Sequence, residues 1–431
     1  MFNLRLMLKF FFSILRFIGA IILLFIVLLI LIVVIQYIIC PVYRFQTREA
    51  FSGTEFYNPY QNIDSALWRK ANFQVQSYAW AGITAGRGNT NEEIYKVYNN
   101  LGYDITATSD YQKINMYRSD EPSYIPVYEH GYGIKKNHQV LIGSKRVLWR
   151  DYPLFQSIHN KQHILNLLRK DNELIYIAHP KLRNAYQPED MKYLANYNGI
   201  EVLNNFCISL EHWDAALSSG NYITILGNDD AHDVSNPDEI GYHCTFINSL
   251  SANKQDILKA LKAGTAFGAR IFRYPGETFK EKIKRTKILP VINLAEIRRD
   301  TLYIWFDSIA KEIRFIGQNG KLLKKSGRTN EAFYKIREED TYIRTEIEFP
   351  DQSVYYLNPV CRYNGISVQK APVPKINVYR TNILRIIGFA TLIFIILNYF
   401  LIRKRIIQRN KNHPKQGNPD VSGRNGRNSG G

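Results

Sequence analysis

The stretch Leu-Gly-Asn-Asp-Asp-Ala-His, residues 226–232, closes a short apolar run that begins at Tyr222. A run of this length that breaks into Asp-x-His is typical of a buried strand that delivers two metal-ligand side chains where it leaves a sheet. Asp230 and His232 are therefore candidate ligands. The neighbouring Asp229 is better explained as the cap of a turn than as a third ligand.

Two other apolar runs also end in groups that bind metals. Residues 174–178 lead into His179, and residues 103–108 lead into Ser109 and Asp110. Active sites of parallel α/β barrels lie at the carboxyl ends of the strands, so these groups are expected at one rim. There Asp110 is expected to orient its neighbours through hydrogen bonds.

The earliest strand of the pattern, residues 72–77, carries Gln74 and Gln76 where a working site of this kind would have histidines. An amide oxygen binds zinc or manganese far more weakly than imidazole does. The strand pattern therefore predicts a metallohydrolase-like rim with a defective first strand.

Capping signals between the strands predict helices. Residues 90–93, Thr-Asn-Glu-Glu, form a capping box at the start of a helix that stops at Gly102. Further helices are predicted from a first-turn proline at residues 187–190, over 210–219 and over 252–263. The alternation of strands and helices predicts an α/β barrel over residues 70–272.

The pattern changes between residues 285 and 368, where short β-prone runs follow one another. They cover residues 301–306, 312–316, 332–336 and 341–344, with a hairpin-type turn at residues 317–320. This composition predicts a small all-β sandwich beside the barrel.

Two apolar segments predict transmembrane helices, over residues 17–40 and 386–402. A cleaved signal peptide is the alternative for the first, but its apolar run is too long and has no small-x-small cleavage site. Basic residues precede the first segment and follow the second. Since positive residues favour the cytoplasm, residues 1–16 and a basic, disordered tail over 403–431 are predicted inside.

The main domain, which residues 41–69 join to the first helix as a linker, is then predicted outside a bacterial inner membrane. The net charge of +18 favours contact with anionic lipid or anionic envelope polymers over nucleic acid, which an extracytoplasmic domain rarely meets. Four scattered cysteines form no C-x-x-C pair, and a Cys207–Cys244 bridge stays open as an alternative.

The strand ends together resemble the PHP (polymerase and histidinol phosphatase) family of metal-dependent phosphoesterases. The resemblance covers roughly residues 70–362 and is greatest to the membrane-associated, carbamate-ester-hydrolysing branch. That branch carries a β domain with motifs that match Asn319-Gly320, Tyr342-Ile343-Arg344 and Asn358-Pro359. The resemblance implies a distorted seven-stranded (β/α)7 barrel that holds up to three metal ions. In this family, metal-bound water attacks a phosphoester.

The family's motifs can be carried onto this chain residue by residue. The His-x-His motif falls on Gln74 and Gln76, and the histidine of Thr-Asp-His falls on Tyr111, whose phenol would have to ionise to act as a strong ligand. The resemblance implies that the remaining metal ligands are Glu129, His138 (with His130 as a competitor), His179, Asp230 and His232.

These replacements lead to two hypotheses. The first is a membrane-anchored pseudoenzyme that acts as a binding or scaffolding module of the cell envelope, with envelope protein partners. The second is a phosphoesterase or related ester hydrolase with a reduced site, in which Asp230 and His232 form the general acid/base pair. Either version holds at most one divalent zinc, manganese or iron ion. A channel is disfavoured, because the spans carry no charge pair within the membrane.

Overall fold

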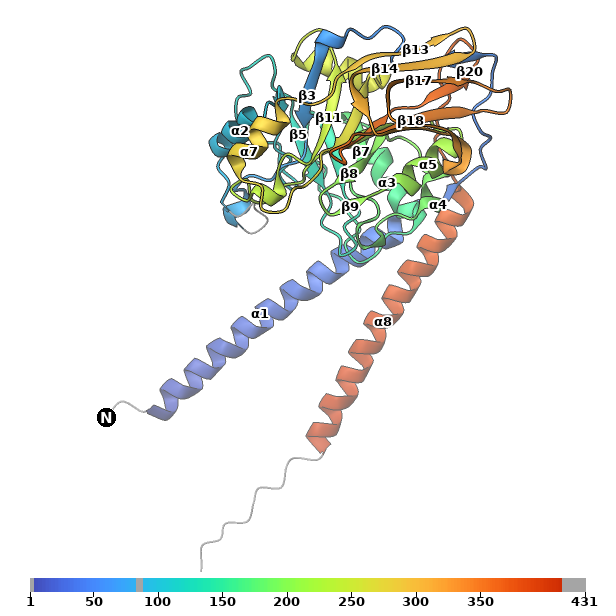
Figure 1. Cartoon of the computed structure of the whole chain (residues 1–431). Helices are drawn as coiled ribbons and strands as arrows, with labels where there is room; N and C mark the ends of the chain where they lie inside the picture. Colours follow the sequence, from blue (N-terminus) through green and yellow to red (C-terminus); the bar gives the residue numbers. More distant parts are fainter. Residues whose placement is uncertain (1–3, 83–87, 413–431) are drawn as a thin grey trace, which may run out of the picture. The chain divides into compact units, whose positions relative to one another are not determined.

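The computed structural model describes residues 4–82 and 88–412 (Figure 1). The described chain up to Asn377 forms one compact unit, and the segment from Val378 onward forms a second. The α-helices are α1 (Leu4–Ile39), α2 (Asn91–Asn100), α3 (Ile158–Leu168), α4 (Pro188–Met191), α5 (Leu210–Ser218), α6 (Lys254–Ala263), α7 (Phe279–Thr286) and α8 (Val378–Asn412).

A sheet of six described strands carries much of the candidate site, in the order β10-β8-β7-β6-β5 with β9 beside β8. Its strands are β5 (Val127–His130), β6 (Gln139–Ser144), β7 (Asn172–Ile177), β8 (Gly199–Asn204), β9 (Cys207–Ile208) and β10 (Thr224–Gly227). Strands β7, β8 and β10 are parallel, whereas β5, β6 and β7 are antiparallel.

A sheet of ten described strands has the order β16-β15-β18-β19-β12-β11-β3-β4, with β2 and β20 at its side. Its strands are β2 (Glu55–Tyr57), β3 (Trp68–Asn72), β4 (Ile105–Thr106), β11 (His243–Asn248), β12 (Ala266–Arg270), β15 (Glu312–Ile316), β16 (Leu322–Ser326), β18 (Tyr342–Glu348), β19 (Val354–Leu357) and β20 (Val360–Tyr363). A three-stranded sheet holds β13 (Ile292–Arg298), β14 (Thr301–Ala310) and β17 (Thr329–Lys335).

The predicted mixed α/β class is confirmed, but the strands do not all run parallel as the sequence analysis expected. Strands β5 and β6 pair antiparallel because the loop between them is short, and only antiparallel neighbours can be joined without a crossover. Strands β11 and β12 pair in the same way. The closed seven-stranded barrel stays a prediction.

The predicted helices form where their capping residues lie. Thr90 and Glu93 make the expected capping box of α2, and Gly264 ends α6 with the left-handed backbone that a glycine C-cap provides. The sequence analysis did not predict α3 and α7. Both begin with a capping box, at Ser157 and Thr278, so the signal was present in the chain.

The β-rich region 285–368 shares its sheet with the preceding region. Strand β19 pairs with β12, and Phe267 lies opposite Leu357 in that pairing. Phe267 also belongs to one buried cluster with Phe306 and Ile347, so the two regions share a core. The β-prone runs are confirmed as strands, while a separate all-β sandwich stays a prediction.

The segment predicted as a linker, residues 41–69, is instead part of the folded unit. Its β1 (Tyr43–Arg44) pairs with β21 (Lys375–Ile376), and β2 pairs with β20. Phe51 and Tyr60 are buried. The aromatic residues that suggested an extended connection are therefore core residues, which fold back on strands far along the chain.

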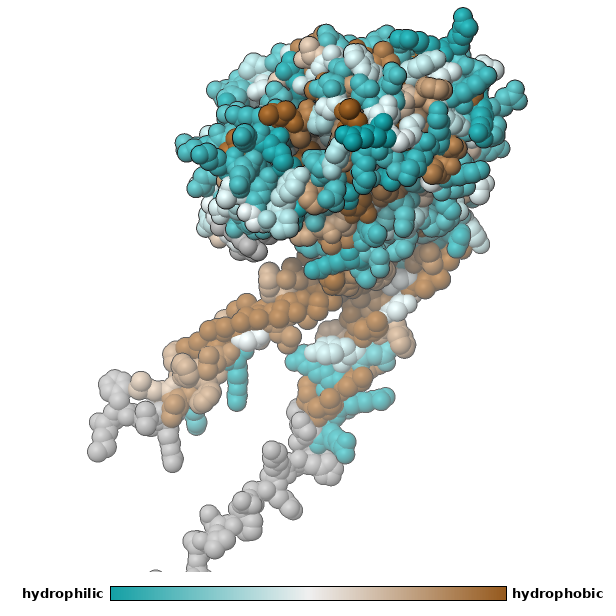
Figure 2. Space-filling model, in the orientation of Figure 1, coloured by the Kyte–Doolittle hydropathy of each residue, from teal (hydrophilic) through white to brown (hydrophobic). Residues whose placement is uncertain are grey.

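Two helices are long and apolar enough to cross a membrane, over Met7–Ile39 and Val378–Arg409. Both exceed the predicted spans, and Figure 2 shows apolar surface along each of them. Helix α8 continues through Asn412, so the first residues of the tail predicted as disordered are helical. Residues 413–431 lie outside the described residues. Cys207 and Cys244 are free thiols, which contradicts the alternative of a bridge between them.

Candidate metal site

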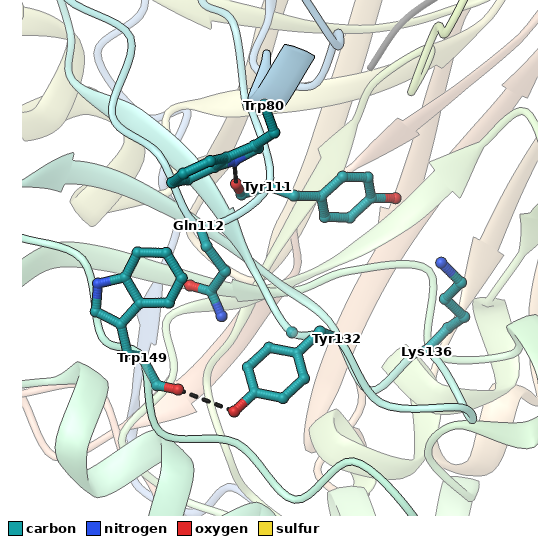
Figure 3. Close-up of a pocket in the computed structure, with 7 residues that line it drawn as sticks. Trp80, Tyr111, Gln112, Tyr132, Lys136 and Trp149 are labelled. Carbon is teal, nitrogen blue, oxygen red and sulfur yellow. Dashed lines mark hydrogen bonds between the residues drawn. The ribbon is translucent and has the colours of Figure 1, made fainter. Parts of the chain in front are cut away.

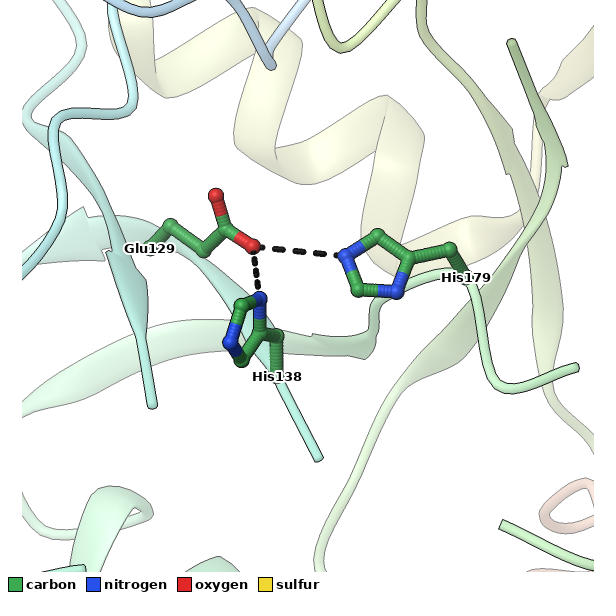
Figure 4. A group of neighbouring side chains, drawn as sticks. All are labelled: Glu129, His138 and His179. Carbon is green, nitrogen blue, oxygen red and sulfur yellow. Dashed lines mark hydrogen bonds and ion pairs between the residues drawn. The ribbon is translucent and has the colours of Figure 1, made fainter. Parts of the chain in front are cut away.

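Three buried side chains, Glu129, His138 and His179, meet with their ligand atoms within 4.8 Å of one another (Figure 4). The carboxylate oxygen Oε1 of Glu129 lies 2.5 Å from Nδ1 of His138 and 3.3 Å from Nε2 of His179. All three residues are almost fully inaccessible to solvent. One carboxylate oxygen thus faces two imidazoles in a dry environment.

The backbone around the antiparallel strands brings these residues together. Glu129 lies in β5, His138 precedes β6, and His179 follows β7. The amide of Ala178 donates to the carbonyl of His138, which fixes the two histidine-bearing segments side by side. Gly131 has a φ of +121°, and a Cβ there would lie 2.6 Å from Cδ2 of His138. The loop therefore requires glycine at this position.

Burial and the neighbouring charges decide the protonation states. Burial raises the pKa of Glu129, but His138 and His179 outweigh it and leave that pKa below its ordinary value. Burial lowers the pKa of His138. For His179 burial also opposes the charge, yet Glu129 and Asp230 raise its pKa to about 9. Without a metal the site therefore holds one imidazolium beside one carboxylate.

Asp230 adds a fourth donor at the edge of this group. Its Oδ2 lies 4.0 Å from Nε2 of His179, and its backbone φ is +52°, an uncommon conformation for an aspartate. Burial and the nearby Glu129 raise the pKa of Asp230. Strand pairing positions it, because Ala231 forms a parallel bridge with Val75.

Glu201 is a buried carboxylate that sequence reasoning missed. It accepts hydrogen bonds from the His179 amide at 3.1 Å and from Asn228 at 2.7 Å. Burial and Asp230 raise its pKa to about 8. The available signal was a single carboxylate inside the apolar strand β8, a position where charge is costly without a specific partner.

Two of the three positions that departed from the family pattern, Gln76 and Tyr111, lie against the same group. Gln76 donates its amide to Oε2 of Glu129 at 2.8 Å, and the ring of Tyr111 lies 5.4 Å from that of His138. Burial and Glu129 raise the pKa of Tyr111 well above its ordinary value, so the phenol stays protonated. Both amide atoms of Gln74 are buried without a hydrogen-bond partner among the described residues.

The other predicted residues have different surroundings. His232 is half-buried, and its Nδ1 contacts the backbone oxygen of Asp230 rather than its carboxylate. Asp110 accepts hydrogen bonds from Ser77 and Asn115. Asp229 accepts three backbone amides, from residues 241–243.

His130 does not join the group. Its Nδ1 contacts Gln139 and its Nε2 contacts the Arg150 carbonyl, at 2.7 and 2.9 Å. The geometry therefore favours His138 over His130 as the partner of Glu129.

The donors fit a divalent metal ion. A carboxylate and two imidazoles are ordinary zinc ligands, and a tetrahedron around zinc has edges of about 3.3 Å, which the Glu129–His179 separation matches. The Glu129–His138 separation of 2.5 Å is a hydrogen-bond distance, so this pair has to move apart to admit an ion. Oδ1 of Asp230 is buried and unpartnered among the described residues. A bound cation would take the place of the proton on His179 as the positive charge of the site.

Comparison with known proteins finds little likeness. No family model matches the chain, and no curated protein matches it. A solved structure from Bacteroides vulgatus ATCC 8482, described as a two-domain protein containing a predicted PHP-like metal-dependent phosphoesterase, is similar over 73% of this chain and 99% of that chain. The identity is 15% and the TM-score 0.35, so the likeness is weak and carries no conclusion about site residues, substrate or activity.

A buried histidine outside the site predicts acid sensitivity. Burial, with Arg270 and Arg273 nearby, lowers the pKa of His243 from 6.5 to about 3. Between these values the unfolded chain binds a proton that the native protein does not. Stability is therefore complete above about pH 6.5 and falls by about 1.4 kcal/mol per pH unit as the pH drops towards 3.

We expect His243→Asn to flatten this part of the stability curve, measured as thermal unfolding of the full chain in detergent between pH 4 and 8. The variant removes the neutral imidazole that contacts Asn205, so its absolute stability is lower. The slope with pH is the decisive quantity. Parallel curves for the two proteins would exclude His243 as the titrating group.

Proposed function

We propose that this protein is a membrane-anchored domain that binds one divalent metal ion between Glu129, His138 and His179, with Asp230 as the fourth donor. The single observation that carries the proposal is the convergence of the ligand atoms of Glu129, His138 and His179 within 4.8 Å in a buried position. The domain acts as a binding or scaffolding module of the cell envelope rather than as a two-metal hydrolase.

The contacts of Glu129 support a single ion. A carboxylate that bridges two metals through separate oxygens needs both of them, but Oε2 of Glu129 accepts the amide of Gln76. Tyr111, which stands beside His138, stays protonated and is a poor ligand in that state. In a two-metal centre, the two ions together stabilise the attacking water and the leaving oxygen. Among its described residues, this protein therefore lacks ligands for the second of those ions.

The membrane placement completes the proposal. Both terminal helices cross the bacterial inner membrane, and the basic residues beside them keep both ends in the cytoplasm. The body between them is extracytoplasmic and meets anionic polymers or protein partners of the envelope. A reporter fused after Gly431 that is active only in the cytoplasm tests this orientation. Activity of a periplasm-specific reporter at the same place would reverse it.

Metal stoichiometry tests the one-ion proposal. We expect the full chain, purified in detergent and loaded with zinc or manganese, to retain at most one equivalent by elemental analysis. The triple variant Gln74→His, Gln76→His, Tyr111→His is expected to bind an additional equivalent, because it supplies the imidazoles that a second ion requires. Two tightly held ions in the unmodified protein would overturn the proposal.

A second candidate function is a one-metal ester hydrolase. The observation that favours it is a cavity of about 420 Å³ that Asp230 and His232 line together with Arg273, so acid, base and cation surround one space. Metal-dependent turnover of a generic phosphodiester, abolished by Asp230→Ala, would establish this function in place of the inert module. Absence of turnover with one equivalent of metal bound supports the binding module.

A further inference from the structure

An aromatic pocket lies directly beside the metal site (Figure 3). It has a volume of about 570 Å³, within the range of small-molecule sites. Its lining residues are Trp80, Tyr111, Gln112, Gly131, Tyr132, Lys136 and Trp149. Two of them, Tyr111 and Gly131, also contact His138, so the pocket and the metal site share a wall.

The polar groups of the pocket are suited to an anion. Gln112 is buried, yet both its amide atoms lack a hydrogen-bond partner among the described residues. Figure 3 shows its amide between Trp149 and Tyr132. Lys136, the one cation among the described lining residues, lies 5.5 Å from the centre of the Tyr111 ring. Lys136 can attract a phosphate group, while the Gln112 amide, on the other side of the pocket in Figure 3, can hydrogen-bond another polar group of the same ligand.

A chain of hydrogen bonds connects this pocket to the end of α1. The Tyr132 hydroxyl donates to the Trp149 carbonyl at 3.0 Å. Two residues after Tyr132, the amide of Ile134 donates to the Pro153 carbonyl at 2.8 Å. The next amides, of Leu154 and Phe155, both donate to the hydroxyl of Tyr37. Tyr37 lies two residues before the end of α1, so the rim of the pocket is attached to the point where the apolar helix ends.

The same rim exposes large apolar side chains. Ile134, Leu154 and Phe155 are 62%, 54% and 60% exposed, and Trp149 is 59% exposed. Tryptophan and tyrosine beside the end of a membrane-spanning helix are typical of the lipid–water interface. The charge of this segment also suits a membrane surface. Residues 131–156 contain five Lys or Arg and a single carboxylate, Asp151, which is buried. Cations in this position favour anionic lipid.

We infer that the pocket binds the phosphate headgroup of an anionic phospholipid, taken from the bilayer that holds α1, while Ile134, Leu154 and Phe155 enter the interface. The inference rests on the proposed membrane crossing of α1, but it does not require that a metal is bound. It goes beyond the proposed function by naming a ligand class and the surface that presents it.

The test uses the full chain in nanodiscs of zwitterionic phosphatidylcholine that contain a fraction of brominated phosphatidylglycerol. Bromine quenches tryptophan emission at contact. We expect Trp149→Phe to remove more than about half of the quenchable emission, since an interfacial tryptophan contacts lipid directly. The matched control is Trp305→Phe, which replaces another partly exposed tryptophan, on β14, and is expected to leave the quenching unchanged.

A second comparison tests the headgroup. When brominated phosphatidylcholine replaces brominated phosphatidylglycerol, quenching is expected to fall. Lys136→Gln is expected to reduce the preference for the anionic lipid about fivefold, which is the usual effect of one cation near an anionic surface. Lys287→Gln, which changes an exposed cation at the end of α7, is the control and is expected to have no effect.

The outcomes separate the possible failures. Equal quenching by both lipids overturns the inference. Trp80 lines the same pocket, so quenching that survives replacement of both Trp80 and Trp149 by Phe also overturns it. If dissolved glycerol 1-phosphate changes Trp149 emission and brominated lipid does not, the pocket binds a soluble phosphoester and the lipid inference is also overturned. Failure of the protein to insert into nanodiscs contradicts the proposed membrane crossing instead, and metal stoichiometry is measured independently.

Discussion

Glutamine in place of Glu129 is expected to weaken zinc binding by about 100-fold or more. Mutation of residues that merely hydrogen-bond to metal ligands already costs 10–100-fold in metal affinity. This substitution removes the one charged donor that contacts both histidines among the described residues. The shape of the side chain is kept, so the fold is expected to survive. Competition with a fluorescent zinc chelator, with the full chain in detergent, measures the affinity.

The matched control is Glu121→Gln. Glu121 is an exposed carboxylate that pairs with Arg118, away from the group of three, and its replacement is expected to leave zinc affinity unchanged. Thermal unfolding of both variants without metal separates loss of binding from loss of structure. Unaltered zinc affinity in Glu129→Gln, with a normal unfolding transition, would show that the ion is held elsewhere.

Methionine in place of Arg344 is expected to destabilise the protein by about 3–5 kcal/mol, the usual result of removing one partner from a buried ion pair. The guanidinium contacts Asp214 through two nitrogens, at 2.7 and 2.8 Å, and also contacts Glu346. It connects β18 to α5. Urea unfolding of the full chain in detergent measures the change in free energy.

An exposed ion pair, Lys311–Glu348, provides the control for the Arg344→Met variant. Lys311 contacts Glu348 at 2.7 Å with more than half of its side chain exposed, so Lys311→Met is expected to cost less than about 1 kcal/mol. The difference between the variants has a physical cause. Without Arg344, the largely buried carboxylate of Asp214 loses its two guanidinium contacts, whereas Glu346 keeps Arg314 at 2.9 Å. Similar losses in both variants would argue against a structural role for the buried pair.

Local signals in the sequence were sufficient for several parts of the fold. The apolar runs before His179 and Asp230 are strands, and both residues lie at strand ends as predicted. Capping residues located α2 and α6. These features depend on neighbours within a few residues of one another, which is why a single sequence contains them.

Long-range pairing could not be predicted in this way. Nothing near Phe267 indicates that β12 pairs with β19, some ninety residues further along the chain. The pairing of β1 with β21 joins residues much further apart, Tyr43 and Ile376, and for that reason residues 41–69 looked like a linker.

The candidate site was only partly accessible from the sequence. Glu129 and His138 were assigned through the family resemblance, because the loop around them has no diagnostic spacing. Glu201 was missed altogether, although it contacts the backbone of His179. Its role depends on what surrounds β8 in space, and Asp230 and Asn228 arrive there from another strand end.

The ring of Tyr111 has a consequence for how the two cavities communicate. One face of this residue belongs to the aromatic pocket, and its edge meets His138. A ligand in the aromatic pocket that displaces the Tyr111 ring changes the space available to the imidazole of His138. If both the proposed ion and the proposed headgroup bind, thermodynamic reciprocity requires that each alters the affinity of the other by the same factor, so a titration of either reports the other.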